Sequence, residues 1–386
     1  MVDSRHQAQR DSLEFPRGRF SPFAGPNPPR HPCIQAGVAG LLFFGAAFGQ
    51  GRGMSEKPFT VMVTGGAGYI GSHAVLALLD AGWPVVVVDN LVTGFRWAVP
   101  DEAVFVQAEV GQTETMIEVI REHGVGAILH FAGSIVVPES VSDPLKYYRN
   151  NTVASRALLE AAVTAGVKHF IFSSTAATYG IPDQVPIREN APKQPINPYG
   201  TSKLMTELML RDTAAAHPIN YCALRYFNVA GADPKGRSGQ STAGATHLIK
   251  IAVEAAIGKR SSVSVFGTDY ATRDGTGVRD YIHVSDLADA HVDALDYLIA
   301  HPGESLTMNC GYGRGYSVLE VLDTVDRVTN RHIERKLEAR RAGDPDELVA
   351  DNSRILATLP WRPKRNDLTM IVTDALAWER KLAERG

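Results

Sequence analysis

Short apolar runs alternate with segments of helical periodicity along the chain from residue 59 onward. An apolar run bounded by turn residues is typical of a buried strand, whereas apolar residues three and four positions apart indicate one covered face of a helix. This alternation predicts a parallel sheet with helices on both faces. The predicted strands are 59–64, 84–88, 103–107, 126–131, 168–174 and 220–225, and the predicted helices between them are 69–81, 112–123, 147–165 and 199–216.

After Gly231 the alternation loosens into a region that contains Gly and Pro. We predict that this part of the chain forms a smaller lobe over the carboxyl edge of the sheet. Ligands of open α/β sheets bind at that edge, so catalytic groups are expected at strand ends. The elements predicted here are helices at 246–257, 285–300 and 317–329 and a strand at 263–266.

Residues 1–53 differ from the rest of the chain, because Arg, Pro and Gly are abundant and an apolar stretch at 36–49 interrupts them. A signal peptide, a regulatory tail, and upstream sequence translated ahead of a true start at Met54 are the three interpretations. We favour the last. Met54 stands a few residues before the first predicted strand, and the apolar stretch holds four glycines without a clear small-x-small cleavage site.

Three closely spaced glycines, Gly65, Gly68 and Gly71, follow the first strand and open a helix. Such glycines permit a tight turn, let backbone N–H groups approach a pyrophosphate, and bring the helix against the strand. The second apolar run, 85–88, ends in Asp89, about 20 residues further on, where an acid binds the ribose hydroxyls of an adenine dinucleotide. The acid would repel the extra phosphate of NADP, so the sequence predicts NAD.

Charge and cysteine content exclude several other classes of protein. The 39 basic and 42 acidic residues give a net charge of −3, so there is no basic excess for nucleic-acid binding. No apolar run reaches the roughly 18 residues that a membrane span needs. Cys33, Cys222 and Cys310 lack the spacing of a zinc site or a disulfide framework, so no metal is predicted and the cytoplasm is the expected location.

A tyrosine and a lysine lie four residues apart at the start of the helix predicted near 199–216. Asn197 can cap this helix, which leaves Tyr199 and Lys203 on one helical face. A bare pair of this kind usually means a solvated face. A nearby ammonium nevertheless favours the phenolate and lowers the pKa of a tyrosine from about 10, so the pair is a candidate proton acceptor for a sugar or alcohol hydroxyl.

Hydroxyl groups emerge where the strand predicted at 168–174 ends. We expect Thr175 to share the substrate hydroxyl with Tyr199. Serines and threonines at a strand end carry little weight alone. Together with the dinucleotide loop and the Tyr-x-x-x-Lys helix, they form a set specific to hydride transfer.

These residues resemble the extended short-chain dehydrogenase/reductase superfamily and, within it, the UDP-glucose 4-epimerases, from about residue 59 to about residue 380. The motifs that carry the resemblance are Thr64-Gly65-Gly66-Ala67-Gly68-Tyr69-Ile70-Gly71-Ser72-His73, Asp89-Asn90, Phe131-Ala132-Gly133, Tyr147-Tyr148-Arg149-Asn150-Asn151, Pro198-Tyr199-Gly200-Thr201-Ser202-Lys203, Arg225-Tyr226-Phe227-Asn228, and the run from Asp274 to Val284.

The resemblance implies a dinucleotide site, a catalytic group and a nucleotide-sugar site. For NAD it implies Gly65, Gly68, Tyr69, Ile70 and Gly71 at the loop, Asp89 and Asn90 at the adenosine ribose, Glu109 and Val110 near adenine, Phe131, Ala132 and Gly133 under the dinucleotide, and Asn150, Tyr199, Lys203 and Phe227 toward the nicotinamide. The implied catalytic residues are Thr175, Tyr199 and Lys203, with Thr175 in place of the more usual serine. The implied substrate contacts are Thr175, Asn228, His247, Leu248, Phe266, Arg279, Arg341 and Asp344.

Besides Thr175, three positions depart from the family pattern. Ile135 stands where many members have a lysine near the nicotinamide, which makes tight retention of NAD less secure. Leu348 stands where some members have a bulky tyrosine that closes the sugar pocket, so by analogy N-acetylated sugars are admitted. His247 replaces an asparagine that often contacts the substrate.

The resemblance implies interconversion of UDP-glucose and UDP-galactose through a 4-keto sugar, with NAD as cofactor. The alternatives are a nucleotide-sugar 4,6-dehydratase and a non-catalytic NAD-binding protein. Dehydratases carry an Asp-Glu pair after the strand-end Thr, and this chain has Ala176-Ala177 there. A homodimer through 112–123 and 147–165 is expected by analogy.

The predicted fold is α/β: a Rossmann-type doubly wound parallel sheet with a smaller C-terminal α/β substrate lobe. Its predicted parts are a disordered leader or mis-assigned start at 1–53, an NAD-binding domain at 54–230 with returning segments from the C-terminal half, and a mainly nucleotide-sugar-binding lobe at 231–386.

Overall fold

The structure is a computed structural model that describes residues 57–341 and 344–384. They belong to one compact unit, Ser55–Gly386. The predicted leader at 1–53, the alternative start at Met54 and Cys33 lie outside the described residues. None of the helices in the described ranges is both long and apolar enough to cross a membrane.

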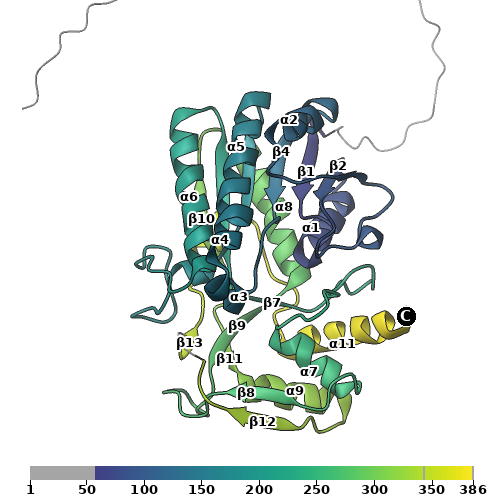
Figure 1. Ribbon diagram of the computed structural model, residues 1–386, viewed down its shortest axis with the longest axis vertical. Coiled ribbons are helices and arrows are strands. Elements are labelled where there is room, and N and C mark those ends of the chain that lie inside the picture. The colour runs from purple at the N-terminus through teal and green to yellow at the C-terminus, as the bar shows by residue number, and fades with distance from the viewer. Residues whose placement is uncertain (1–56, 342–343, 385–386) are drawn as a thin grey trace, which may run out of the picture. The chain divides into compact units, whose positions relative to one another are not determined.

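A seven-stranded parallel sheet forms the centre of the upper part of the molecule (Figure 1). Its strands are β1 (Thr60–Thr64), β2 (Val85–Asp89), β3 (Val104–Gln107), β4 (Val125–His130), β5 (His169–Thr175), β6 (Asn220–Tyr226) and β10 (Leu306–Cys310). Their order is β10-β6-β5-β4-β1-β2-β3, so the chain starts near the middle and winds outward in both directions. The six predicted strands are confirmed with ends shifted by no more than one residue.

Helices cover both faces of this sheet, and the alternation of side chains along β1 shows why. Val61 and Val63 face one apolar cluster, whereas Met62 between them faces another. The first cluster includes side chains of α1 (Tyr69–Asp80) and α8 (Val284–Ala300). The second includes side chains of α2 (Thr113–Glu122), α5 (Ala154–Ala165) and α6 (Pro198–Ala216). The α/β doubly wound class is therefore confirmed.

The helix predicted at 147–165 is confirmed, but it begins earlier and changes type along its length. It consists of α4 (Pro144–Tyr147), the π-helical segment η2 (Tyr148–Val153) and α5. The strand β10 and the helix α8 come from the C-terminal half and complete the sheet, although no strand was predicted at 306–310. The run Leu306–Cys310 contains polar Thr307 and Asn309, so its sequence lacks the apolar character of the other strands.

The remaining elements form the lobe below the sheet in Figure 1. They include α7 (Leu248–Ala256), β8 (Val263–Phe266), β9 (Val278–His283), β11 (Gly315–Ser317), α9 (Val318–Thr329), β12 (Arg335–Glu338), β13 (Glu347–Leu348) and α11 (Leu368–Glu384). Here β9 pairs with β11, β13 and β7 (Asn228–Ala230), and β8 pairs with β12. The helices predicted at 246–257, 285–300 and 317–329 and the strand at 263–266 are confirmed, whereas α11 was not predicted.

The shorter elements complete the chain. They are η1 (Arg96–Ala98), α3 (Val137–Ser142), η3 (Ala176–Thr178) and α10 (Ser353–Thr358).

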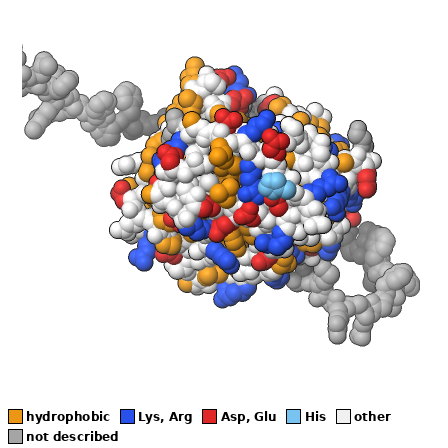
Figure 2. Space-filling view, turned by 90° about the horizontal axis from the view of Figure 1, so that it is seen from below, with side chains coloured by type: hydrophobic (Ala, Val, Ile, Leu, Met, Phe, Trp, Pro, Cys, Tyr) orange, Lys and Arg blue, Asp and Glu red, His pale blue; other side chains and the backbone are white. Residues whose placement is uncertain are grey.

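The face of the lobe seen from below carries Lys and Arg side chains interspersed with Asp and Glu (Figure 2). That face therefore presents no continuous basic surface of the kind that binds nucleic acid.

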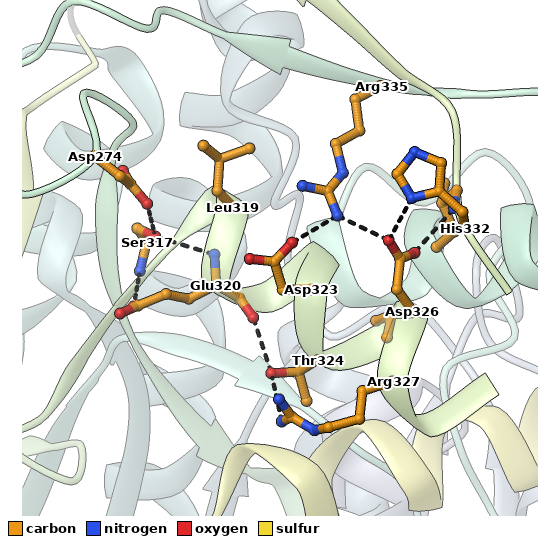
Figure 3. Close-up of polar contacts among 12 residues, drawn as sticks. Asp274, Ser317, Leu319, Glu320, Asp323, Thr324, Asp326, Arg327, His332 and Arg335 are labelled. Carbon is orange, nitrogen blue, oxygen red and sulfur yellow. Dashed lines mark hydrogen bonds and ion pairs between the residues drawn. The ribbon is translucent and has the colours of Figure 1, made fainter. Parts of the chain in front are cut away.

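The start of α9 anchors the loop that leads into β9 (Figure 3). Ser317 and Glu320 form a capping box, in which the Ser317 hydroxyl accepts from the Glu320 N–H and the Glu320 carboxylate accepts from the Ser317 N–H. The same Ser317 hydroxyl donates to Asp274. Asp274, the first residue of the long family motif, therefore serves to hold the loop.

Candidate active site

Close backbone packing explains the three glycines of the loop between β1 and α1. A Cβ on Gly71 would lie 2.2 Å from the Gly65 carbonyl oxygen, and one on Gly65 would lie 2.7 Å from the Ala132 nitrogen. Gly65 also has a φ of +70°, a conformation that glycine adopts without strain. The Gly68 N–H donates to the Gly65 carbonyl at 3.1 Å, so the loop closes into a tight turn directly before the N-terminus of α1.

Asp89 holds this loop from the end of β2. Its carboxylate accepts from the Ala67 N–H at 3.0 Å and from the Leu91 N–H at 2.8 Å. Burial is the main cause that raises its pKa, partly opposed by these two hydrogen bonds. Beside it, the Asn90 amide donates to both carboxylate oxygens of Glu109 at 3.2 Å. The structure thus brings the predicted adenosine-side residues together at one sheet edge, with Val110 buried next to Glu109.

Tyr69 and Ile70 form the first turn of α1 and pack against the apolar cluster beneath the loop. The Tyr69 hydroxyl donates to the Gly231 carbonyl at 2.7 Å, which ties the loop to the chain that leaves β7. Phe131 follows β4 on the other side, where its N–H donates to the Thr64 carbonyl at 3.0 Å. The predicted dinucleotide residues therefore line the carboxyl ends of β1, β2 and β4.

Asn151 was not among the predicted site residues, and the structure gives it a connecting position. Its side chain accepts from the Ser134 N–H at 2.7 Å and donates to the Ser134 carbonyl at 3.0 Å and to the Ser202 hydroxyl at 2.9 Å. It therefore links the turn after Gly133 to the residue before Lys203. Its neighbour Asn150 donates to the Ser134 hydroxyl at 3.0 Å. Both lie in η2, and π-helical turns are frequent at functional sites.

The catalytic candidates meet where β5 ends and α6 begins. Asn197 caps α6 by accepting from the Gly200 N–H at 2.9 Å, as predicted. Tyr199 is hydrogen-bonded to Thr175, the last residue of β5. Lys203 is buried, and its Nζ donates to the Ser173 carbonyl at 2.9 Å. Strand and helix thus bring all three predicted residues to one place.

The effect of Lys203 on the pKa of Tyr199 stays a prediction. Burial raises the pKa of Tyr199, and the hydrogen bond with Thr175 lowers it. The Lys203 ammonium is directed to the Ser173 carbonyl, and burial lowers its own pKa to about 8. Thr175 therefore contributes to the ionisation of Tyr199 through its hydrogen bond.

The predicted substrate residues form two contact pairs on the lobe. Arg279, on β9, forms an ion pair with Asp344. The Arg341 guanidinium lies 3.7 Å from the centre of the Phe266 ring at the end of β8. Arg279 also lies in register with Leu348 of β13.

The other predicted substrate residues lie near the beginning of β7 and of α7. Phe227 and Leu348 pack against one small cluster of buried apolar side chains, and Asn228 follows Phe227 in the chain. His247 directly precedes Leu248, the first residue of α7. The Nδ1 atom of His247 is buried without a hydrogen-bond partner among the described residues, and burial lowers the pKa of the imidazole.

Most charged residues of the motif from Asp274 to Val284 have structural roles. Asp280 is buried and accepts from the N–H groups of Tyr312, Gly313 and Ala350 at 2.9, 2.9 and 3.2 Å. Burial raises its pKa to about 6 against these three hydrogen bonds. Arg279, which is also on β9, instead forms an ion pair with Asp344.

Ile135, at the position where many relatives have a lysine, is half exposed at 51%. The cofactor side of the site therefore has an apolar side chain there and no additional cation from this position.

In the described parts of the chain, no group of three or more His, Cys, Asp or Glu side chains is arranged to hold a metal ion.

Comparison with known proteins shows extensive similarity. The model of the NAD dependent epimerase/dehydratase family matches residues 61–311. A UDP-glucose 4-epimerase from Azospirillum brasilense is 57% identical over 324 residues, which are 84% of this chain and 93% of that protein.

Two solved structures are also similar over nearly their whole length. One is a UDP-glucose 4-epimerase from Stenotrophomonas maltophila with bound NAD and formylated UDP-arabinopyranose, with 40% identity and a TM-score of 0.82 over 85% of this chain and 100% of that one. The other is the UDP-Glc/GlcNAc 4-epimerase from Campylobacter jejuni, with 44% identity and a TM-score of 0.74 over 84% of this chain and 99% of that one.

Proposed function

Because this chain belongs to the NAD dependent epimerase/dehydratase family and, within it, to the UDP-glucose 4-epimerases, we propose that its site inverts C4 of a UDP-sugar. The reaction interconverts UDP-glucose and UDP-galactose through a 4-keto sugar. The observation that carries the assignment of residues is the meeting of Tyr199, Thr175 and Lys203 at the end of β5, beside the glycine loop of a dinucleotide site.

NAD is the cofactor, and the residues around the loop fit it. Gly65 and Gly71 have no room for a side chain, so they allow the tight turn that precedes the N-terminus of α1, and a helix N-terminus can bind a pyrophosphate. Asp89 and Asn90 are the proposed contacts of the adenosine ribose, Glu109 and Val110 those of adenine, and Phe131 to Gly133 those of the underside of the dinucleotide. When bound, NAD supplies the reversible hydride acceptor and a positive charge on its nicotinamide ring that favours a nearby phenolate.

Tyr199 is the proposed proton carrier at the sugar C4 hydroxyl. Its phenolate oxygen receives the proton from O4 in the first half of the reaction, and the resulting hydroxyl returns the proton in the second half. Thr175 hydrogen-bonds the phenol and thereby favours its ionised form. Lys203 adds a buried cation one helical turn away and is fixed by the Ser173 carbonyl.

Inversion requires the 4-keto sugar to present its opposite face, so the hexose turns while the UDP part stays held. Arg279 and Arg341 are the proposed diphosphate and nucleotide contacts, since a guanidinium can bind phosphate oxygens through two parallel hydrogen bonds. In the structure Arg279 is paired with Asp344. Strong contacts at the diphosphate and weaker contacts at the hexose permit this rotation.

The proposed range of sugars rests on the side chains of Phe227 and Leu348. A leucine at position 348 occupies less space than the tyrosine of some relatives, and it packs against the same cluster as Phe227. We therefore propose that UDP-N-acetylhexosamines are also substrates. The Campylobacter jejuni relative, whose name includes both UDP-Glc and UDP-GlcNAc, supports this extension.

The dehydratase alternative is disfavoured by the residues that follow Thr175. Elimination of water needs an acid and a base near the sugar, and Ala176 and Ala177 form the short helix η3 at that place. A non-catalytic NAD-binding role is disfavoured because it gives no reason for the hydrogen bond between Thr175 and Tyr199.

A homodimer is the proposed assembly, and its interface lies on α3, α4, η2 and α6. These four elements lie side by side. They expose large apolar side chains of Val141, Leu145, Val153, Met205 and Leu208, and contiguous exposed apolar surface marks association sites. The helix α2, within the expected segment 112–123, instead buries Met116, Val119 and Ile120 in the core of its own chain.

We also propose a cytoplasmic location, supported by the free thiols of Cys222 and Cys310.

The function is tested by mixing the purified protein with UDP-glucose, UDP-galactose and their N-acetylated counterparts and following the products by NMR. Interconversion within each pair is expected without consumption of added NADH. A 4-keto sugar that accumulates in place of the epimer would reject the epimerase assignment in favour of a dehydratase.

A further inference from the structure

A buried ion pair lies behind the candidate site, between α6 and β6. The Arg225 guanidinium donates to the two carboxylate oxygens of Glu207 at 2.9 and 2.6 Å. Their side chains are only 5% and 7% exposed. Removing two charges from water is costly, so a buried pair is weak evidence of a role in stability alone. Neither residue belongs to the predicted catalytic, cofactor or substrate sets.

The Glu207 carboxylate also binds the strand that carries Thr175. The hydroxyl of Ser174, the residue directly before Thr175, donates to Glu207 at 2.5 Å. Along α6, Glu207 follows Lys203 by four residues, and Lys203 follows Tyr199 by four, so the three lie on one face of the helix. One carboxylate therefore fixes the helix face with Tyr199 and Lys203 to the strand end with Thr175.

Arg225 extends the same network across the sheet. Its Nη1 donates to the Tyr179 hydroxyl at 2.8 Å, which in turn donates to Asn309 of β10 at 2.6 Å. Arg225 also lies near the end of β6, two residues before Phe227. Burial alone would lower the pKa of the guanidinium, but the contacts with Glu207 raise it, so Arg225 stays charged. The network thus joins β5, β6, β10 and α6.

We propose that Glu207 and Arg225 are positioning residues, which set the separation of the Tyr199 and Thr175 hydroxyls. The inference rests on the proposed epimerase function. The hydrogen bond between Thr175 and Tyr199 joins a strand to a helix, so its geometry is only as fixed as the docking of α6 on β5. A displacement of about 1 Å at a reacting centre can cost about 100-fold in rate.

The variant Glu207→Gln keeps the shape of the side chain but leaves Arg225 buried without a countercharge. We expect kcat to fall about 10- to 100-fold, whereas KM for UDP-glucose changes less than about 2-fold, because the proposed diphosphate contact Arg279 lies on β9. The pH profile of kcat should shift, because the hydrogen bond that lowers the pKa of Tyr199 is disturbed.

The matched control is Glu379→Gln. It breaks another buried ion pair, between Glu379 of α11 and Lys250 of α7, whose side chains are 1% and 7% exposed. We expect both variants to have a lower melting temperature than the wild type, because each loses a buried ion pair. In Glu379→Gln the pH profile of kcat should be unchanged. Equal pH profiles for wild type and Glu207→Gln, with only the melting temperature lowered, would overturn the positioning role.

Ser174→Ala is the milder variant, because it removes one hydrogen bond to Glu207 and no charge. It should lower kcat a few-fold and shift the pH profile in the same direction, and an unchanged profile counts against the proposal even if Glu207→Gln does not fold. Inactivity of the wild type would reject the proposed function instead. In that case the pKa of Tyr199 can still be measured from the ultraviolet absorbance of its phenolate, with Tyr199→Phe as the reference spectrum. The positioning role then predicts different pKa values of Tyr199 in the wild type and in Ser174→Ala.

Discussion

At the scale of single residues, burial sets the protonation of the groups at the site. Lys203 has a pKa lowered to about 8, and the pKa of Tyr199 is raised, both because water is excluded from them. The Tyr-x-x-x-Lys spacing predicted which residues meet. It did not predict that Lys203 donates to the Ser173 carbonyl, since that contact depends on how α6 lies over β5.

Replacing Tyr199 by Phe removes the proposed proton carrier and keeps the ring. We expect kcat to fall about 100- to 10,000-fold, the usual contribution of general acid–base catalysis, with KM for UDP-glucose nearly unchanged. Steady-state kinetics measures both. Tyr297→Phe is the control, because Tyr297 donates to Glu304 on the exposed side of α8 and should leave kcat unchanged. Wild-type kcat in Tyr199→Phe would assign the proton transfer to another group.

The raised pKa of Asp280 should make the stability of the fold decrease as the pH rises through about 6. Its folded-state pKa of about 6 lies above the ordinary value of 3.8, so the folded protein binds the proton more tightly than the unfolded chain. This carboxyl therefore stabilises the fold most at low pH, and its contribution is lost as pH rises through about 6. Between about pH 5 and about pH 7 the loss is about 1 kcal/mol.

Urea unfolding of the wild type and of Asp280→Asn at these two pH values measures that contribution. The variant should be less stable at both values, because an amide cannot accept all three backbone N–H groups. The difference in unfolding free energy between wild type and variant should be larger at about pH 5 than at about pH 7. A constant difference would show that Asp280 does not titrate in this range.

At the scale of elements, the strand, loop and helix from β1 to α1 follow from local sequence, whereas the π-helical turns within the helix predicted at 147–165 do not. An apolar periodicity continues through that segment, but the structure inserts the π-helical turns of η2. Within these turns the Asn151 side chain forms hydrogen bonds with Ser134 and Ser202, which belong to two segments distant in sequence. Periodicity reports which face of a helix is covered, and it carries no information about such long-range hydrogen bonds.

Gly71→Ala tests the loop as an element. The new Cβ would lie 2.2 Å from the Gly65 carbonyl oxygen, so the loop or α1 must move. We expect weaker NAD binding and a free energy of unfolding lower by about 1–3 kcal/mol, as measured by fluorescence titration and urea unfolding. Gly111→Ala is the control, because its Cβ would meet only an ordinary contact at 3.5 Å. Normal NAD affinity in Gly71→Ala would contradict the assignment of the loop.

At the scale of the whole molecule, the site is assembled from both halves of the chain. The sheet that carries Thr175 is completed by β10 and covered by α8, both of which follow the first lobe strands in sequence. Arg279, one of the residues proposed for the sugar nucleotide, lies on β9, and β9 pairs with β7, which directly follows β6 in the chain. Cofactor and substrate residues therefore share one connected framework.

The proposed homodimer is tested by charging its apolar surface. Leu145→Glu combined with Leu208→Glu places two carboxylates on side chains that are 77% and 42% exposed. Sedimentation velocity should show a dimer for the wild type and a monomer for this variant, since buried like charges at an interface are unfavourable. Val92→Glu, at another exposed valine, should stay dimeric. A monomeric wild type would exclude the dimer.

The sequence by itself determined the alternation of strands and helices, the glycine loop, the acid at position 89 and the spacing of Tyr199 and Lys203. These features depend on contacts between residues close together in the chain. The tertiary structure decided the place of β10, the π-helical turns of η2, the partner of Lys203 and the ion pair of Glu207 with Arg225. Each of these depends on segments far apart in sequence, whose packing no local pattern records.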